Sequence, residues 1–195
     1  MHRPIMLTLL LAVMLAVTLE AADDIRFSYH RGSEGFSFQP PGVDRVEEKW
    51  DDSRRLEVGL WNVTGASSWG ISGIQQKADY AEGPLDLSYE SMGARLYFAQ
   101  AYPFSQALSL DFQSFIGWSR TDIKVRLDSD SYDDNSWMYE YGLMAQLVFA
   151  SNPREGLVVA AGGGYLFTRG DFSIDGSRKF EQEGFFLTGT VGWRF

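Results

Sequence analysis

The sequence predicts an all-β protein in which eight antiparallel strands form an up-and-down transmembrane β-barrel. Apolar and polar residues alternate over segments of about 10 to 13 residues. That length suits a tilted strand that crosses a membrane, whereas strands of soluble sheets usually contain about five or six residues. Short and long connectors follow one another in turn along the chain. No apolar run after residue 24 reaches the roughly 18 residues that indicate a spanning helix.

The chain begins with a candidate export signal. Arg3 precedes an apolar run of 13 residues, and the following residues are small and acidic. This layout is typical of a secretory signal peptide, which we expect to comprise residues 1–22 and to be cleaved after Ala21 or Ala22. A membrane anchor is the alternative, but 13 apolar residues are short for a spanning helix of about 20. The barrel is therefore expected to comprise residues 23–195.

Eight strands follow from the alternation and from the turns between them. Short connectors at 64–68, 102–106 and 151–156 are built on Pro, Gly, Asn and Ser, which favour tight turns. Longer polar stretches at 32–54, 78–86, 128–136 and 175–183 are interpreted as loops. The strands that remain are 24–31, 55–63, 69–77, 87–101, 106–127, 137–150, 157–174 and 184–195.

Periodicity alone does not decide whether the apolar face meets lipid or a lumen. A secreted soluble barrel, such as a lipocalin, also alternates, with its apolar face inside. The second face here is rich in Gly, Thr and Ala, which suits the narrow interior of an eight-stranded barrel. Aromatic residues gather near strand ends, as in the girdles of membrane barrels, and the connectors on one side are short and on the other long. These features favour a membrane barrel.

Composition excludes several kinds of function. The chain has no cysteine, so that a disulfide framework, thiolate catalysis and a cysteine-based zinc site are all excluded. His30 is the only histidine besides His2, which leaves with the signal, so no site with several histidine ligands can form. We expect no metal and no cofactor. The formal net charge of −9 argues against nucleic acid, which requires a basic face.

The last strand carries the most specific motif. The chain stops on Phe195, and every second position before it is apolar or Gly: Leu187, Gly189, Val191 and Trp193. In this ending and in its general plan, the chain resembles the small eight-stranded outer-membrane β-barrels of Gram-negative bacteria. That class includes the transmembrane domain of outer membrane protein A, outer membrane protein X and the opacity-type surface proteins. The motif identifies a class and no particular member.

The resemblance implies a location and partners. Leu187, Val191, Trp193 and Phe195 would form the signal that the barrel-assembly machinery reads. The protein would lie in the bacterial cell outer membrane, in contact with lipid and lipopolysaccharide, with both ends in the periplasm and four loops facing outward. We expect a monomer.

Ionisable residues on the inward face are expected to form a polar network in the lumen. They are Arg26, His30, Glu57, Arg95, Asp111, Glu140 and Arg194. Side chains fill the lumen of an eight-stranded barrel, and charges buried there must be paired. We expect Arg95 to pair with Glu140 or Glu57, and Arg194 or Arg26 to pair with Asp111. The alternative to a structural plug is a proton or ion path.

An acidic segment, 128–135, could be taken for a calcium loop. A calcium loop requires oxygen ligands at alternating positions and a Gly at the sixth, where this chain has Asp133, and its fifth position is Tyr132. The match therefore fails. A looser contact with divalent cations at the lipopolysaccharide surface is the alternative to a solvated loop tip.

An enzyme that modifies lipid A is a further alternative. Two families of small barrels, a palmitoyltransferase and a deacylase, place a Ser and a His near the outer leaflet. His30 is the only candidate base here, with Ser33, Ser37 or the loop serines as possible nucleophiles. The late His-x-Ser element of the deacylase and the amphipathic helix that precedes the palmitoyltransferase barrel are both absent. The prediction is that the protein is not an enzyme.

The function that these observations favour is non-enzymatic. The protein would be a structural component of the envelope or a surface protein for adhesion or binding that acts through its extracellular loops. The first loop is the best candidate for contact with an unknown extracellular ligand, because Phe36, Phe38 and Trp50 could form an exposed aromatic cluster. Alternatively, these aromatic residues prolong the first two strands above the membrane. A soluble periplasmic ligand-binding β-barrel is the other alternative.

Overall fold

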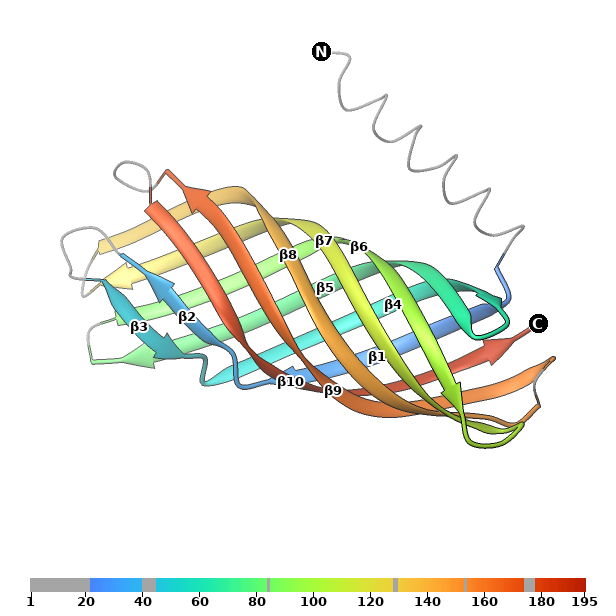
Figure 1. Ribbon diagram of the computed structural model, residues 1–195. Coiled ribbons are helices and arrows are strands. Elements are labelled where there is room, and N and C mark those ends of the chain that lie inside the picture. Colours follow the sequence, from blue (N-terminus) through green and yellow to red (C-terminus); the bar gives the residue numbers. More distant parts are fainter. Residues whose placement is uncertain (1–21, 40–44, 84, 128–129, 153, 174–177) are drawn as a thin grey trace, which may run out of the picture.

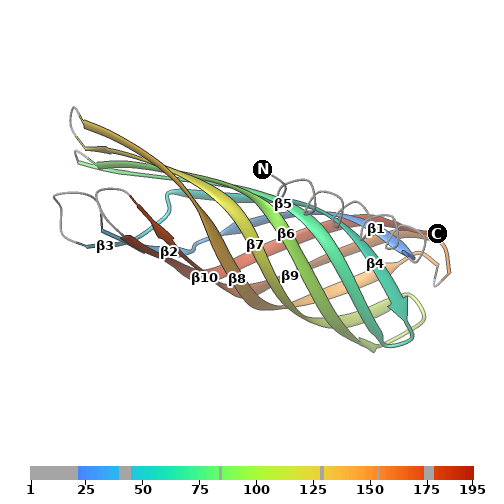
Figure 2. The same cartoon turned by 90° about the horizontal axis from the view of Figure 1, so that it is seen from above.

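The protein folds into one closed, tilted β-barrel, seen along its side in Figure 1 and from above in Figure 2. The computed structural model describes residues 22–39, 45–83, 85–127, 130–152, 154–173 and 178–195. The proposed signal peptide, residues 1–22, lies outside the described residues except for Ala22. Among the described residues, no helix is long and apolar enough to cross a membrane.

Eight strands form the ring, which confirms the predicted fold class. They are β1 (Asp24–Gly32), β4 (Asp52–Thr64), β5 (Ser67–Glu82), β6 (Leu85–Pro103), β7 (Leu108–Leu127), β8 (Asp130–Ala150), β9 (Gly156–Phe172) and β10 (Arg178–Arg194). Each strand is antiparallel to the next, and β10 closes the ring on β1, with Asp24 opposite Arg194. The barrel thus has a turn end, where β1 begins and the chain ends, and an opposite end (Figure 1).

The turn end has the three short connectors that the sequence predicts. They join β4 to β5, β6 to β7 and β8 to β9. In the first of them only Gly65 and Ala66 separate the two strands, and Gly65 has a φ of 64°. A two-residue hairpin loop needs such a left-handed conformation, which Gly adopts without steric cost.

The first predicted loop contains a hairpin that the sequence analysis missed. Strands β2 (Gly35–Phe38) and β3 (Val46–Lys49) pair with each other, and β2 also pairs with Glu181–Glu183 of β10. The hairpin therefore continues the sheet beyond the point where β1 ends, and its end of the barrel is called the hairpin end below (Figure 1).

An apolar belt surrounds the barrel and extends from the turn end toward the hairpin end. It consists of outward side chains that are between 39% and 73% exposed, among them Phe27, Leu56, Phe98, Phe112, Ile116, Leu143, Val159, Phe185, Leu187 and Trp193. Contiguous apolar surface of this extent is unfavourable in water and suits hydrocarbon. Toward the hairpin end, the outer face of each strand changes from apolar to polar. The residues that mark this change, one on each strand, are Arg31, Arg54, Lys77, Glu90, Arg120, Asn135, Arg169 and Glu183. We call these eight the boundary residues.

Beyond the boundary the strands continue, but the polarity of their two faces is inverted. In β7, Ile123 and Val125 point inward and are 0% exposed. Their neighbours Asp122, Lys124 and Arg126 point outward into solvent. The alternation keeps its period of two, since it is imposed by strand geometry, while the apolar face changes sides because the surroundings change from lipid to water.

The predicted extent of three loops is therefore wrong. Most of 78–86 belongs to β5 and β6, residues 130–136 belong to β8, and residues 178–183 belong to β10. Charged residues in these segments, such as Asp79, Asp86 and Glu183, are on the outer face of an extended barrel. The residues at the tips, 84, 128–129 and 174–177, lie outside the described part of the chain.

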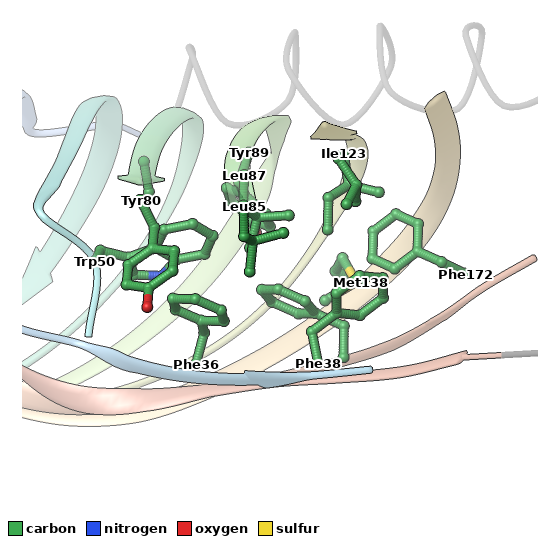
Figure 3. Packing of buried hydrophobic residues seen from close by; sticks show 13 residues of the cluster. Phe36, Phe38, Trp50, Tyr80, Leu85, Leu87, Tyr89, Ile123, Met138 and Phe172 are labelled. Atoms are coloured by element: carbon green, nitrogen blue, oxygen red, sulfur yellow. The ribbon is translucent and has the colours of Figure 1, made fainter. Parts of the chain in front are cut away.

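A hydrophobic cluster fills the lumen at the hairpin end and is called the upper core (Figure 3). Its buried members are Phe36, Phe38, Trp50, Ala78, Tyr80, Leu85, Leu87, Tyr89, Ile123, Val125, Met138, Phe172 and Phe180. The ring of Phe36 stacks on that of Trp50, with 4.2 Å between the centroids. Loop one therefore does not present the exposed aromatic cluster that was expected. Its three aromatic side chains are between 1% and 5% exposed and pack inward.

Truncation of Trp50 tests whether the upper core stabilises the barrel. Trp50→Ala is expected to lower the free energy of unfolding by about 3–5 kcal/mol, as for other buried aromatic side chains. Urea unfolding of the barrel in lipid vesicles measures it. Trp137→Ala is the matched control, because Trp137 is 48% exposed on the outer face. Equal stability of the two variants would contradict the packing described here.

Candidate functional site

The centre of the lumen holds an ion cluster built around Arg95. This side chain is 0% exposed and contacts Glu140 through two nitrogens, with Nη2 donating to Oε2 at 2.8 Å. Its Nη1 donates to Glu57 Oε2 at 3.2 Å, and the hydroxyl of Tyr97 donates to the same oxygen at 2.7 Å. His30 Nε2 lies 3.3 Å from this oxygen too. The predicted pairing of Arg95 is confirmed, and it involves both carboxylates.

A second ion cluster lies at the turn end. Arg26 Nη2 and Arg194 Nε each donate to the carboxylate of Asp24, in both cases at 2.6 Å. Arg194 or Arg26 was expected to pair with Asp111; in the described part of the chain the ion pair of Arg26 is with Asp24 instead, and Asp111 accepts a hydrogen bond from Ser109 at 2.7 Å. Asp24 was missed because it lies at the very start of β1. One signal was available in the sequence: Asp24 has the same even parity as Arg26 on this strand, and residues of equal parity share a face.

A third polar layer separates the central ion cluster from the upper core. Arg55 is 2% exposed, and its Nη2 donates to Gln76 Oε1 at 2.8 Å. A second contact joins Arg55 to Glu34 at 3.9 Å. Sequence reasoning missed Arg55, although it has the same parity as Glu57 on the same strand. It was the first residue of a predicted strand and so was not assigned to a face.

These layers fill the lumen with paired charges and packed apolar side chains. A buried ion pair of fixed geometry is a structural element, because removing one partner leaves an uncompensated charge away from water. The upper core, whose members are mostly apolar side chains, fills the lumen between the central ion cluster and the hairpin end. The arrangement therefore favours the structural plug over the ion path.

His30 is poorly placed to attack a lipid. It points inward, is 2% exposed, and contacts the ring of Phe186 edge-on, with 5.4 Å between centroids. Among the candidate nucleophiles, Ser33 is exposed and Ser37 accepts a hydrogen bond from Arg45 at 2.6 Å. The imidazole is thus inside the barrel beside Glu57, and not on the outer face that a membrane lipid could reach.

The outer surface at and beyond the boundary residues is densely charged, and cross-strand pairs stabilise it. Lys77 Nζ lies 2.9 Å from Glu90, and Arg120 Nη2 donates to Asn135 at 2.6 Å. A groove of about 550 Å³ crosses β5, β6, β7 and β8 here, and its polar lining includes Asp79, Ser88, Asp122, Lys124 and Asp133. Both signs of charge are therefore presented side by side on a regular sheet.

Glu181 connects the hairpin of β2 and β3 to the ring of strands through ion pairs. It contacts Arg169 of β9 through both the Nε and Nη2 atoms of that arginine, and Arg45 Nη2, next to β3, donates to it at 3.3 Å. The hydrogen bond from Arg169 lowers the pKa of the Glu181 carboxyl, and the charge of Arg45 acts in the same direction. A second groove, of about 1020 Å³, lies around the outer side of this hairpin.

The proposed assembly signal lies on the outer face of the final strand. Leu187, Val191, Trp193 and Phe195 are between 50% and 73% exposed and belong to the apolar belt. Their role in assembly stays a prediction. Among the described residues, no group of three or more His, Cys, Asp or Glu side chains could hold a metal ion.

No protein-family model matches the chain, and no curated protein matches it either. Solved structures do match over most of its length. Neisserial surface protein A has 13% identity and a TM-score of 0.53, with 89% of this chain and 98% of that chain covered. Ail, the attachment invasion locus protein of Yersinia pestis, has 17% identity and a TM-score of 0.45, with coverage of 89% and 99%.

A third match is the outer membrane protease OmpT from Escherichia coli, with 10% identity, a TM-score of 0.48, and coverage of 89% of this chain and 97% of that chain. At such low identities the likeness to neisserial surface protein A shows the fold alone. The chain has the fold of a small outer-membrane β-barrel.

Removal of the central cation tests the ion cluster. Arg95→Met leaves Glu57 and Glu140 buried without a cation, so the free energy of unfolding should fall by about 3–5 kcal/mol. Urea unfolding in vesicles measures the loss. Arg120→Met removes the same charge from an exposed position and should change stability by about 1 kcal/mol or less. If the two variants were equally stable, Arg95 would not organise the lumen.

The Glu181 pairs predict a pH dependence of the hairpin. Because the folded pKa is lowered, the stabilisation is complete above the ordinary value of 4.5 and is lost as the pH falls through the lower folded value. Amide exchange of residues 36–38, corrected for the intrinsic rate, should therefore accelerate below about pH 4.5. Glu181→Gln should exchange faster at neutral pH and show a smaller acceleration. An unchanged acid response in Glu181→Gln would contradict this assignment.

Proposed function

We propose that this chain is a non-enzymatic barrel of the bacterial outer membrane that binds an extracellular ligand through the part that projects beyond the boundary residues. In this proposal residues 1–22 direct export, the turn end faces the periplasm, and the hairpin end faces outward. The barrel acts as a monomer and needs no cofactor.

The observation that carries the proposal is the rigid projection itself. Strands β5 to β8 continue past the belt to residues such as Glu82, Leu85 and Leu127, and the upper core fills the space between them. A barrel that served only as a membrane anchor would need no such core. A surface that is already ordered loses little conformational entropy when it binds, so more of the contact energy appears as affinity.

The chemistry of the projection indicates a polar ligand. Its outward side chains are mainly charged and carry both signs, as for Asp122, Lys124 and Arg126 on β7. Surfaces of this kind select partners by charge complementarity more than by apolar burial. A protein or glycan with both charges or with many hydroxyl groups fits better than an apolar compound, because the apolar side chains of this region are buried.

The two alternative functions have less support. A soluble ligand-carrying barrel would hold its apolar face inside throughout, whereas this one exposes an apolar belt and buries charges at the same height. A lipid A-modifying enzyme would need its base on the outer face, and His30 lies in the lumen.

The test combines fractionation with whole-cell attachment. The full chain is expressed in a Gram-negative host, and heat-modifiable migration in the carbonate-insoluble membrane fraction is expected. Cells that carry it should then attach to a panel of immobilised extracellular-matrix proteins and glycosaminoglycans more than cells with the empty vector do.

Charge reversal identifies the surface that is responsible. Arg126→Glu, alone or with Lys124→Glu, should reduce attachment severalfold, whereas Arg154→Glu should not, because Arg154 is exposed in a turn at the opposite end. A carbonate-soluble product would contradict the location. Normal barrel insertion without attachment to any surface would contradict the binding role.

A further inference from the structure

A groove crosses the apolar belt on its outer side. It has a volume of about 920 Å³ and crosses strands β6 to β10, with Ser67 of β5 at one end and Arg31 of β1 at the other. Its walls are the exposed side chains of Phe98, Phe112, Leu143, Phe185 and Leu187 and the half-buried side chain of Tyr165. Its floor is made by small residues, Ser114, Ala145 and Gly163. Ala145 lies directly opposite Gly163 on the next strand, and Gly163 lies opposite Leu187.

A row of cations begins where this groove ends. Arg31 lines the groove and lies opposite Leu187 on one side and opposite Arg54 on the other. Arg54 in turn lies opposite Lys77. All three are exposed boundary residues on the outer face, so three like charges occupy adjacent strands. Like charges directly opposite one another destabilise a sheet unless something compensates them.

Acidic side chains compensate only part of this row. Arg54 Nη2 lies 2.6 Å from Asp52, and Lys77 Nζ lies 2.9 Å from Glu90. Arg31 has no ion pair with any residue that the structure describes. An arginine beside the belt residue Leu187, with a second arginine opposite, therefore keeps an unmatched positive charge at the edge of the hydrocarbon.

We propose that the groove and the cation row together bind one acidic glycolipid of the outer leaflet, a lipid of the lipid A type that carries two phosphates. An acyl chain lies in the groove between the aromatic walls, and a phosphate is bonded by Arg31 and Arg54. This proposal rests on the outer-membrane location proposed above, with the hairpin end facing outward.

The dimensions agree with this ligand. Neighbouring strands are about 4.8 Å apart, so the row from Arg31 to Lys77 spans about 10 Å, which is wider than a single phosphate needs. Guanidinium groups bind phosphate oxygens in a bidentate manner, and such charge-assisted bonds are strong at the edge of an apolar medium. A groove of about 920 Å³ also falls within the usual size of ligand sites, about 300–1,000 Å³.

The experiment measures lipid retention by the purified, folded barrel. The full chain is extracted in a mild detergent, bisphosphorylated lipid A or phosphatidylglycerol is added, and native mass spectrometry counts the bound lipid. The wild type should retain lipid A in a one-to-one complex. Arg31→Gln with Arg54→Gln should weaken binding about tenfold or more, the factor for roughly 1.4 kcal/mol.

Two further variants separate the parts of the site. Ala145→Leu places a larger apolar side chain on the groove floor and should weaken binding without any change of charge. Arg120→Gln with Arg126→Gln removes the same charge from exposed positions outside the groove and should leave binding unchanged. Heat-modifiable migration checks that each variant is folded.

The outcomes distinguish this inference from the proposed function. An equal loss of lipid A binding in the two double arginine variants would overturn the site. No loss of binding in Arg31→Gln with Arg54→Gln would overturn it too. Equal binding of phosphatidylglycerol would overturn the choice of a bisphosphorylated glycolipid. A barrel that inserts into the outer membrane and supports attachment but binds no lipid A would refute this inference alone, whereas a chain that never reaches the membrane would refute the proposed function.

Discussion

The inversion of side-chain polarity at the boundary residues is the constraint on which the rest of the structure depends. Below it, the strands expose apolar side chains and bury ion clusters beside apolar side chains such as Phe115, whereas above it they expose charges and bury the apolar upper core. Strand geometry keeps one alternation throughout, so each strand can meet two different solvents without a break. The same inversion places the belt, fixes the height of the cation row and forms the projecting surface proposed to bind a ligand.

The contents of the lumen also differ between the two sides of the boundary. Buried charges below the boundary must be compensated within the barrel, and Arg95 meets this need with Glu57 and Glu140. Above the boundary the hairpin of β2 and β3 supplies Phe36 and Phe38 to the upper core. Loop one therefore acts as a plug for the lumen, and the surface that remains for ligands is the charged outer face of the strands.

The ring of strands and the Arg95 pairing could be predicted from the sequence, because period-two alternation assigns each residue to a face. The extent of the strands could not, because a charged segment such as 78–86 has the composition of a loop unless the outer face of a strand is known to change from apolar to charged. The burial of Trp50 depends on what lies across the lumen, and this is a tertiary fact that no local pattern carries. Asp24 and Arg55 were missed at strand ends, where alternation has too few neighbours to assign a face.

The inversion can be tested most directly by labelling single cysteines, because the chain has none of its own. A membrane-impermeant maleimide is applied to cells that carry one cysteine at a time at positions 122 to 126 of β7. We predict that cysteines in place of Asp122, Lys124 and Arg126 react rapidly while those in place of Ile123 and Val125 are protected. Uniformly rapid labelling at all five positions, as in a flexible loop, would contradict the account.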